Sequence, residues 1–349
     1  MENTKPKTSK KKQIFRIILF ASTFISLWFV PWILVKAWIL PLPNTVQEQV
    51  DQTLGYGFDG VIVYVDEAGK PPAIYTAGYH DSAKLIPAKP NALFKIASIS
   101  KLYVAVAITR LANENRISLD KPLTDYFPEL SDRVENAGKI TLRMMVQHRS
   151  GIPNFTDNPE YWKNQPNTNV DVLKYALDLP ANFEPNKDHG YSNTNYLLLS
   201  RIIEQATGGS RQDYFKKEIL IPLGLNNTYG SINEVNIEDV MSGYYVGIDK
   251  DFKNEDSGMM LATAEDVGKF VRALNDGSLL NEQEMEIYTS LYEFNHGGLA
   301  AGYQCLAEYH KDIDAVVVQI MNTTDFEGYQ WNLLEITHSR VVKILSKGK

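Results

Sequence analysis

The sequence predicts an α+β fold, in which strands near the two ends of the chain form one antiparallel sheet. Helices flank this sheet, and a largely helical subdomain is inserted between its two halves. β-Branched and aromatic residues with strand spacing gather around residues 61–77 and again around 303–321. Most segments between these regions repeat their apolar residues at helical spacing. Strands at both ends with helices between them favour a sheet that the two termini complete.

Each terminal region has the pattern of a β-hairpin. The turn-rich segment 66–72 separates the first two apolar runs, and residues 311–314 join the last two. The four predicted strands are residues 61–65, 73–77, 303–309 and 315–321.

Capping residues and glycines bound the predicted helices. Serine and threonine are typical first residues of a helix, and glycine is typical of its end. The helices predicted in this way cover residues 45–54, 98–112, 141–148, 169–179, 192–207, 210–219, 263–275 and 331–345.

The first forty residues differ from the rest. Residues 17–35 are nineteen in a row without a charge, which is about the thickness of a bilayer, and the apolar run continues to residue 40. We expect a basic cytoplasmic segment (1–16), a transmembrane anchor (17–40), a tether with a first helix (41–59) and a globular domain (60–349). A cleaved signal peptide is the alternative, and both alternatives place the globular domain outside the cytoplasm. The expected protein is therefore a single-pass membrane protein.

Charge and cysteine content exclude several classes of partner and site. The first forty residues hold seven basic side chains against one acidic, a net +6, so the total of −7 leaves −13 for the remainder. An acidic globular part argues against a nucleic-acid partner, because phosphate binding needs clustered Lys and Arg. Cys305 is the only cysteine, which excludes an intrachain disulfide and a cysteine-rich zinc site. We expect neither a cofactor nor a metal.

The segment from Ser98 to Lys101 is the first candidate for catalysis. Residues three apart share a face of a helix, and Ser98 would lie in the first turn, where free N–H groups favour a developing oxyanion. A neutral Lys101 could remove the serine proton. A core helix that carries Ser and Lys by chance is the alternative, because Ser-x-x-Lys is a short motif.

Two further segments place polar residues in turns, at Tyr191-Ser192-Asn193 and at His296-Gly297-Gly298-Leu299. Each has a structural alternative. Tyr191 could be a hydrophobic staple before a helix capped by Ser192 or Asn193, and His296 to Gly298 could be an ordinary loop.

Taken together, the three segments resemble the serine β-lactamase and penicillin-binding-protein family. The resemblance is to the branch of class C β-lactamases, D-alanyl-D-alanine carboxypeptidases and esterases. Ser-x-x-Lys, Tyr-x-Asn and His-x-Gly follow one another in the order found there, and the similar stretches extend roughly from Gly60 to Val342. The resemblance implies a β-lactamase/transpeptidase-like fold and a serine hydrolase that forms an acyl-enzyme.

The resemblance also implies roles for the reacting residues. Ser98 would attack the carbonyl, and Lys101 and Tyr191 would share the transfer of its proton to the leaving group. Because a phenol has a pKa of ~10, Tyr191 would act as a base only if a nearby cation stabilised the phenolate. Asn193 would hold the substrate amide and Lys101.

The third motif would supply substrate binding. The backbone N–H groups of Ser98 and Leu299, the latter on an edge strand, would form the oxyanion hole. Gly297 and Gly298 would let this backbone approach the substrate closely. His296 stands where the lactamase motif has a lysine, and we expect it to bind a substrate carboxylate less strongly than a fixed ammonium would.

The expected function is a membrane-anchored serine hydrolase that acts on amide, peptide or ester substrates. A D-alanyl-D-alanine-type peptide of the cell wall is the expected kind of substrate or partner. The alternative is a catalytically inactive homologue that binds a peptide or muropeptide in the same cleft.

Overall fold

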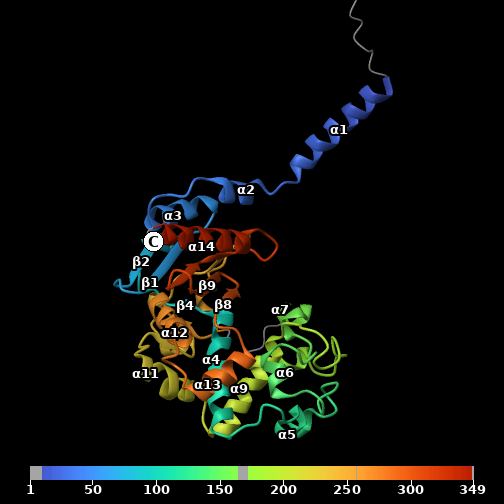
Figure 1. The fold of residues 1–349 in the computed structure, drawn as a ribbon, viewed down its shortest axis with the longest axis vertical. Helices are drawn as coiled ribbons and strands as arrows, with labels where there is room; N and C mark the ends of the chain where they lie inside the picture. Colours follow the sequence, from blue (N-terminus) through green and yellow to red (C-terminus); the bar gives the residue numbers. More distant parts are fainter. Residues whose placement is uncertain (1–9, 164–171, 257, 348–349) are drawn as a thin grey trace, which may run out of the picture. The chain divides into compact units, whose positions relative to one another are not determined.

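The computed structural model describes residues 10–163, 172–256 and 258–347. The chain divides into two compact units, Met1–Pro41 and Leu42–Lys349. Figure 1 shows both units as a ribbon.

In the first unit, the structure has two helices in place of the single helix that was expected over residues 17–40. They are α1 (Lys10–Trp28) and α2 (Trp32–Ile39), and the bend between them is 81°. Pro31 explains the break, since its ring disfavours helical conformation at the preceding residue and removes a backbone donor. Within the described residues no single helix has the length and apolar composition to cross a bilayer, and only the bent pair meets both criteria together.

In the second unit, a six-stranded sheet confirms the predicted α+β class. Its strand order is β3-β2-β1-β10-β9-β8, and every neighbouring pair is antiparallel. The two termini complete it, since Val61 of β1 faces Met321 of β10. The strands are β1 (Gly60–Glu67), β2 (Ala73–Asp81), β3 (Ile86–Pro87), β8 (His296–Ala300), β9 (Tyr303–His310) and β10 (Ala315–Met321).

Two small sheets were not predicted, because their strands are only two residues long. One has the order β4-β7-β5, and the other pairs β11 with β6 in parallel. The strands are β4 (Phe94–Lys95), β5 (Thr228–Tyr229), β6 (Tyr244–Tyr245), β7 (Leu261–Ala262) and β11 (Thr323–Thr324). The first of these sheets leads directly into the segment that carries Ser98.

The predicted capping residues begin helices as expected. The side chains of Thr45, Thr141, Ser210 and Thr263 each accept a hydrogen bond from a backbone N–H of the helix that follows. The described helices of the second unit are α3 (Val46–Thr53), α4 (Ser100–Asn113), α5 (Leu123–Tyr126), α6 (Leu142–Val146), α7 (Pro159–Lys163), α9 (Asn193–Thr207), α10 (Arg211–Phe215), α11 (Ile221–Leu223), α12 (Ala264–Asp276), α13 (Glu282–Leu291) and α14 (Gln330–Ser346).

Two of the predicted helices differ from expectation. Of the helix predicted over 169–179, residues 169–171 lie outside the described residues, and the remainder contains the 3-10 turn Leu173–Tyr175. The helix predicted over 210–219 continues after α10 as a π-helical turn, Lys216–Leu220.

Helices cover both faces of the sheet. Helices α3 and α14 pack on one face, and α12 packs on β1, β9 and β10. The packing of α12 on β1 is tight, because a Cβ at Gly268 would lie 2.2 Å from the ring of Tyr64. Helix α4 is buried between the helices α9 and α13, so that the segment following Ser98 is held from several sides.

Candidate active site

Ser98 lies in a 3-10 turn, Ala97–Ile99, that runs directly into α4. The turn is strained, since Ala97 has a φ of 46°, in the left-handed region that a residue with a side chain rarely adopts. From Leu102 to Ile108 every residue of α4 is buried, so the helix is a rigid support. The result is a serine hydroxyl fixed at the start of a core helix.

Lys101 lies one turn further along this helix and contacts the serine. Its Nζ is 3.0 Å from Ser98 Oγ and 2.8 Å from Asn193 Oδ1. The aromatic rings of Tyr191 and Tyr196 lie 4.8 and 5.5 Å from the Nζ. Burial lowers the pKa of Lys101 to about 7, because the low-polarity surroundings disfavour the ammonium. A large fraction of Lys101 is therefore a neutral amine near pH 7, as a general base must be.

Tyr191 contacts the serine from the other side. Its hydroxyl donates to Ser98 Oγ over 2.6 Å. Burial raises the pKa of Tyr191 to about 12, an effect that the hydrogen bond to Ser98 partly offsets and the nearby Glu293 increases. The phenol thus stays protonated at neutral pH. A protonated phenol can donate a proton, and the expectation that Tyr191 also acts as a base stays a prediction.

Asn193 begins α9 and is held in one orientation. Its backbone N donates to Asn154 Oδ1 over 3.0 Å. Its side-chain Nδ2 lies 3.3 Å from Asn154 Oδ1 and also 3.3 Å from Thr156 Oγ1. These contacts turn the Oδ1 of Asn193 towards Lys101. The sequence reasoning missed Asn154 and Thr156, because neither belongs to a recognisable motif.

The start of α9 bears on the structural alternative for Tyr191, in which Ser192 or Asn193 caps the helix that follows. Ser192 is the N-cap of α9, but its side chain makes no capping hydrogen bond. Its backbone N–H instead donates to His148 Nδ1 over 3.1 Å, and the His148 ring stacks on Tyr191 with centroids 4.5 Å apart. Burial lowers the pKa of His148 to about 3, so the ring is neutral. His148 therefore acts as a positioning residue for Tyr191.

His296 begins β8, and its ring contacts protein groups at both nitrogens. Its Nε2 lies 2.8 Å from the hydroxyl of Tyr292, and its Nδ1 lies 2.5 Å from the carbonyl oxygen of Gly297. Burial lowers the pKa of His296 to about 4, an effect that the hydrogen bond to the Gly297 carbonyl partly offsets and the nearby Lys101 increases. A neutral ring is not a cation for a substrate carboxylate, which agrees with the expectation of weaker binding than a fixed ammonium would give, and the role of His296 in substrate binding stays a prediction.

Gly297 and Gly298 are needed for packing against protein, and the close approach of a substrate to them stays a prediction. A Cβ at Gly298 would lie 2.5 Å from the carbonyl oxygen of Ile96 and 2.7 Å from Cys305 Sγ. A Cβ at Gly297 would lie 2.6 Å from the ring of Trp331. The glycines thus let β8 run directly beside the turn that carries Ser98.

The position of β8 beside the Ser98 turn supports the predicted oxyanion hole, which the backbone N–H groups of Ser98 and Leu299 would form. Strand β8 is the edge of the sheet, and β9 lies on one side of it only. In an edge strand, every second backbone N–H points away from its neighbour. Leu299 lines the same cavity as Ser98, so the two N–H groups named in the prediction belong to one site.

The cavity beside Ser98 has a volume of about 270 Å³ and holds both apolar and charged groups. Its apolar wall includes Val104, Leu197 and Met260. Arg211 also lines it, and the Nη1 of this guanidinium donates to Ser200 Oγ over 2.8 Å. Burial lowers the pKa of Arg211, while Glu204 raises it, and a guanidinium remains charged at neutral pH. A cation therefore faces the cavity from a residue that the sequence reasoning did not find.

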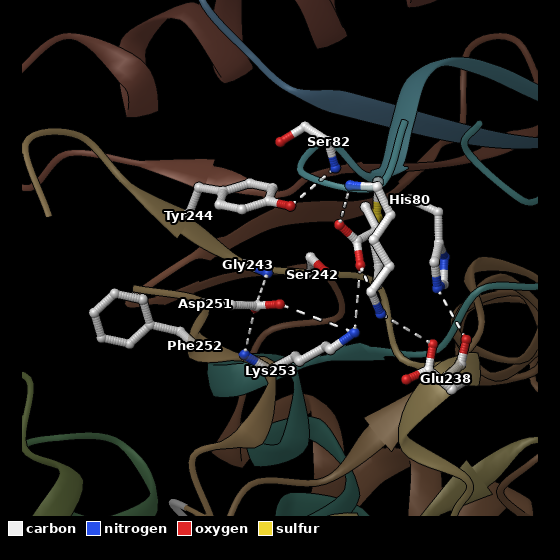
Figure 2. Close-up of polar contacts among 12 residues, drawn as sticks. His80, Ser82, Glu238, Ser242, Gly243, Tyr244, Asp251, Phe252 and Lys253 are labelled. Carbon is white, nitrogen blue, oxygen red and sulfur yellow. Dashed lines mark hydrogen bonds and ion pairs between the residues drawn. The ribbon is translucent and has the colours of Figure 1, made fainter. Parts of the chain in front are cut away.

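One wall of the cavity is a loop that buried ionic contacts hold in place. Figure 2 shows Asp251 accepting from the backbone N–H groups of Gly243 and Lys253, each over 2.9 Å. The buried ammonium of Lys253 lies 3.8 Å from Asp81 and 3.9 Å from Asp251. These contacts fix the loop between β6 and β7.

Lys95 ties the same loop to the nucleophile segment. Its Nζ donates to the carbonyl oxygens of Phe252 and Glu255, over 2.6 and 2.7 Å. Phe252, Glu255 and Lys95 all line the cavity. The sequence contains Lys95 three residues before Ser98, but nothing in it indicates a loop more than 150 residues away as its partner.

Comparisons with known proteins agree with this geometry. A family model described as Beta-lactamase matches residues 43–307. The chain is 26% identical to penicillin-binding protein 4* of Bacillus subtilis (strain 168) over 277 residues, which cover 70% of this chain and 59% of that protein. It is 28% identical to protein flp of Staphylococcus aureus (strain N315) over 193 residues, which cover 54% of this chain and 39% of that protein. The match thus spans less than two thirds of either relative.

Solved structures share the fold. A D-amino acid amidase from Ochrobactrum anthropi SV3, complexed with D-phenylalanine, has a TM-score of 0.77 and 24% identity, covering 88% of this chain and 99% of that one. A penicillin-binding protein from Bacillus halodurans has a TM-score of 0.71 and 21% identity, covering 85% and 99%. At these identities the likeness shows the fold alone. Because the family model spans well over half of the sequence, however, the chain belongs to the beta-lactamase family of serine hydrolases, which act through an acyl-enzyme.

Proposed function

We propose that this protein is a membrane-anchored hydrolase that cleaves an amide, peptide or ester bond beside a D-amino acid. The observation that carries the proposal is the position of Ser98 Oγ, 3.0 Å from the Nζ of Lys101 and 2.6 Å from the hydroxyl of Tyr191. A nucleophile, an amine that is partly neutral near pH 7 and a protonated phenol within hydrogen-bonding distance are the groups that acyl transfer needs.

The proton transfers follow from these contacts. As Ser98 Oγ bonds to the substrate carbonyl carbon, its proton passes to the neutral Lys101. Tyr191 then gives its proton to the leaving group, and the Lys101 ammonium gives a proton back to Tyr191. The bond from the carbonyl carbon to the leaving nitrogen or oxygen breaks, and an ester to Ser98 remains. In the second half, Lys101 takes a proton from a water as the water oxygen bonds to the ester carbon, the bond from that carbon to Ser98 Oγ breaks, and the Lys101 ammonium returns the proton to Ser98 Oγ.

The expected substrate carries an anionic group. Arg211 provides a charged guanidinium in the cavity wall, with Ser200 Oγ as the partner of its Nη1. A planar guanidinium suits a carboxylate, and His296 is neutral. A solved relative in fold is a D-amino acid amidase and another is a penicillin-binding protein. These observations favour a short D-amino-acid peptide with a free carboxylate over its amide.

The proposed anchor rests on the first unit of the chain. Residues 17–35 are uncharged, and basic residues precede them. After alkaline carbonate extraction of cells that produce the full chain, we expect the protein in the membrane pellet, and a variant without residues 10–40 in the supernatant. Recovery of the full chain in the supernatant would contradict the anchor.

Covalent labelling tests the proposed chemistry. The full chain in detergent is treated with a fluorophosphonate and, separately, with a fluorescent β-lactam. We expect an adduct on the peptide that contains Ser98, found by mass spectrometry, and none on a Ser98→Ala variant. A D-peptide acid should compete with labelling better than the matching amide. A folded protein that forms no adduct with either reagent would count against an acyl-enzyme and favour the inactive binding homologue.

A further inference from the structure

A cluster of three side chains outside the active site has the geometry of a metal centre. Glu308 and His310 lie two residues apart on β9 and so share one face of the sheet. His338, on α14, packs against this face and is only 3% exposed. The three side chains bring two imidazole nitrogens and one carboxylate oxygen together within 4.8 Å.

The three atoms form a nearly regular triangle. His310 Nε2 lies 3.2 Å from His338 Nε2, and Glu308 Oε2 lies 3.3 Å from His338 Nε2 and 3.5 Å from His310 Nε2. Ligands that bind one zinc ion tetrahedrally at about 2.0–2.1 Å must lie about 3.3–3.4 Å from one another. The triangle therefore has the size of one face of a zinc coordination tetrahedron.

We propose that Glu308, His310 and His338 bind a divalent transition-metal ion of the zinc type. Two imidazoles and one carboxylate are ligands that Zn²⁺ binds well, whereas Mg²⁺ and Ca²⁺ prefer sites made of oxygen atoms alone. Three protein ligands leave the fourth position to a water molecule. The site joins the central strand region to the C-terminal helix, since Glu308 and His310 come from β9 and His338 from α14.

The role of the metal is to hold the fold together rather than to react. His310 is the last residue of β9. Cys305 lies nearer the start of that strand, where its Sγ is 3.7 Å from the carbonyl oxygen of Gly298 and borders the nucleophile segment. The proposed metal centre is thus at the other end of the strand from Ser98. A ligand that binds only the folded chain stabilises it, so the ion should raise the melting temperature without being needed for acylation of Ser98.

Metal titration of the full chain tests this site. The protein, without a histidine tag and stripped with EDTA, is titrated with ZnCl₂ in a calorimeter and with CoCl₂ in an absorption spectrometer. We expect one equivalent of Zn²⁺ to bind, a higher melting temperature, and visible Co²⁺ absorption typical of tetrahedral coordination. The rate of Ser98 labelling should be the same with and without EDTA, which separates this proposal from the proposed hydrolase.

Two ligand variants and one control complete the test. His338→Gln and the less buried His310→Gln should each weaken zinc binding by at least about tenfold, since even partners outside the ligand shell are worth about 10–100-fold. His189→Gln, a histidine outside the cluster, should bind as the wild type does. If the wild-type chain binds no stoichiometric zinc, or if His310→Gln and His338→Gln bind it as tightly as the wild type, the cluster is a hydrogen-bonded one only and the proposal is overturned.

Discussion

Replacing Ser98 with alanine is expected to reduce turnover of an ester or amide substrate by on the order of 10³-fold or more, the size of loss found when a catalytic nucleophile is removed. The physical reason is direct, because Ser98 Oγ is the atom that lies between Lys101 and Tyr191. The measurement is kcat/KM of the purified full chain in detergent, with circular dichroism as a check that the variant is folded.

Ser100→Ala is the matched control. Ser100 begins α4, two residues after Ser98, and its hydroxyl donates to the carbonyl oxygen of Ala97 over 2.7 Å. Loss of this local hydrogen bond should cost stability of ~1 kcal/mol and change kcat/KM little. Equal activity of Ser98→Ala and the wild type would contradict the hydrolase. Unchanged ligand affinity without any wild-type turnover would identify the binding homologue instead.

The second large effect concerns pH and Lys101. The pKa of Lys101 is lowered to about 7 by burial, and only the neutral amine can accept the proton of Ser98. As pH rises through about 7, the fraction of neutral Lys101 grows, so kcat/KM should rise and then level off. A lysine in water would place this rise near pH 10.4. The profile of the wild type for a neutral ester, free of substrate ionisation, gives the measurement.

Two variants assign the rise to Lys101. Lys101→Arg keeps a cation of similar length that cannot lose its proton, so activity should fall by on the order of 10³-fold at every pH. Tyr191→Phe removes the hydroxyl but keeps the ring that stacks on His148, so it should lower the rate and leave the rise near pH 7 in place. A rise that disappears in Tyr191→Phe would show that the tyrosine is the base.

Much of the fold could be predicted because its signals are local. The capping threonines at 45, 141 and 263 and the alternation of the strands in the two hairpins depend on neighbouring residues. The contacts among Ser98, Lys101, Tyr191 and Asn193 could be expected from the resemblance, which supplied the pairing of distant motifs. The bend at Pro31 was not predicted, although a proline within an apolar helix is a known cause of a break.

The features of the site that were not predicted depend on packing between distant segments. The ring of His296 is buried by Tyr292, at the end of α13, and no pattern around His296 indicates its direction. Arg211 reaches the cavity because α10 folds back on α9, and its sequence context reads only as a helix start. The sequence indicates which helix carries Arg211, but the tertiary structure determines which cavity wall its side chain lines.

The pairing of β1 with β10 has a consequence for how the chain folds. Val61 and Met321 face one another, although 260 residues separate them in the sequence. Loop-closure entropy makes contacts of such separation slow to form, and high contact order predicts slow folding. Until β10 has been synthesised, the β1 edge of the β1–β2 hairpin has no partner strand. An unpaired apolar edge promotes aggregation. The edge of β1 therefore stays open to aggregation until β10, near the C-terminus, has been synthesised and has paired with it.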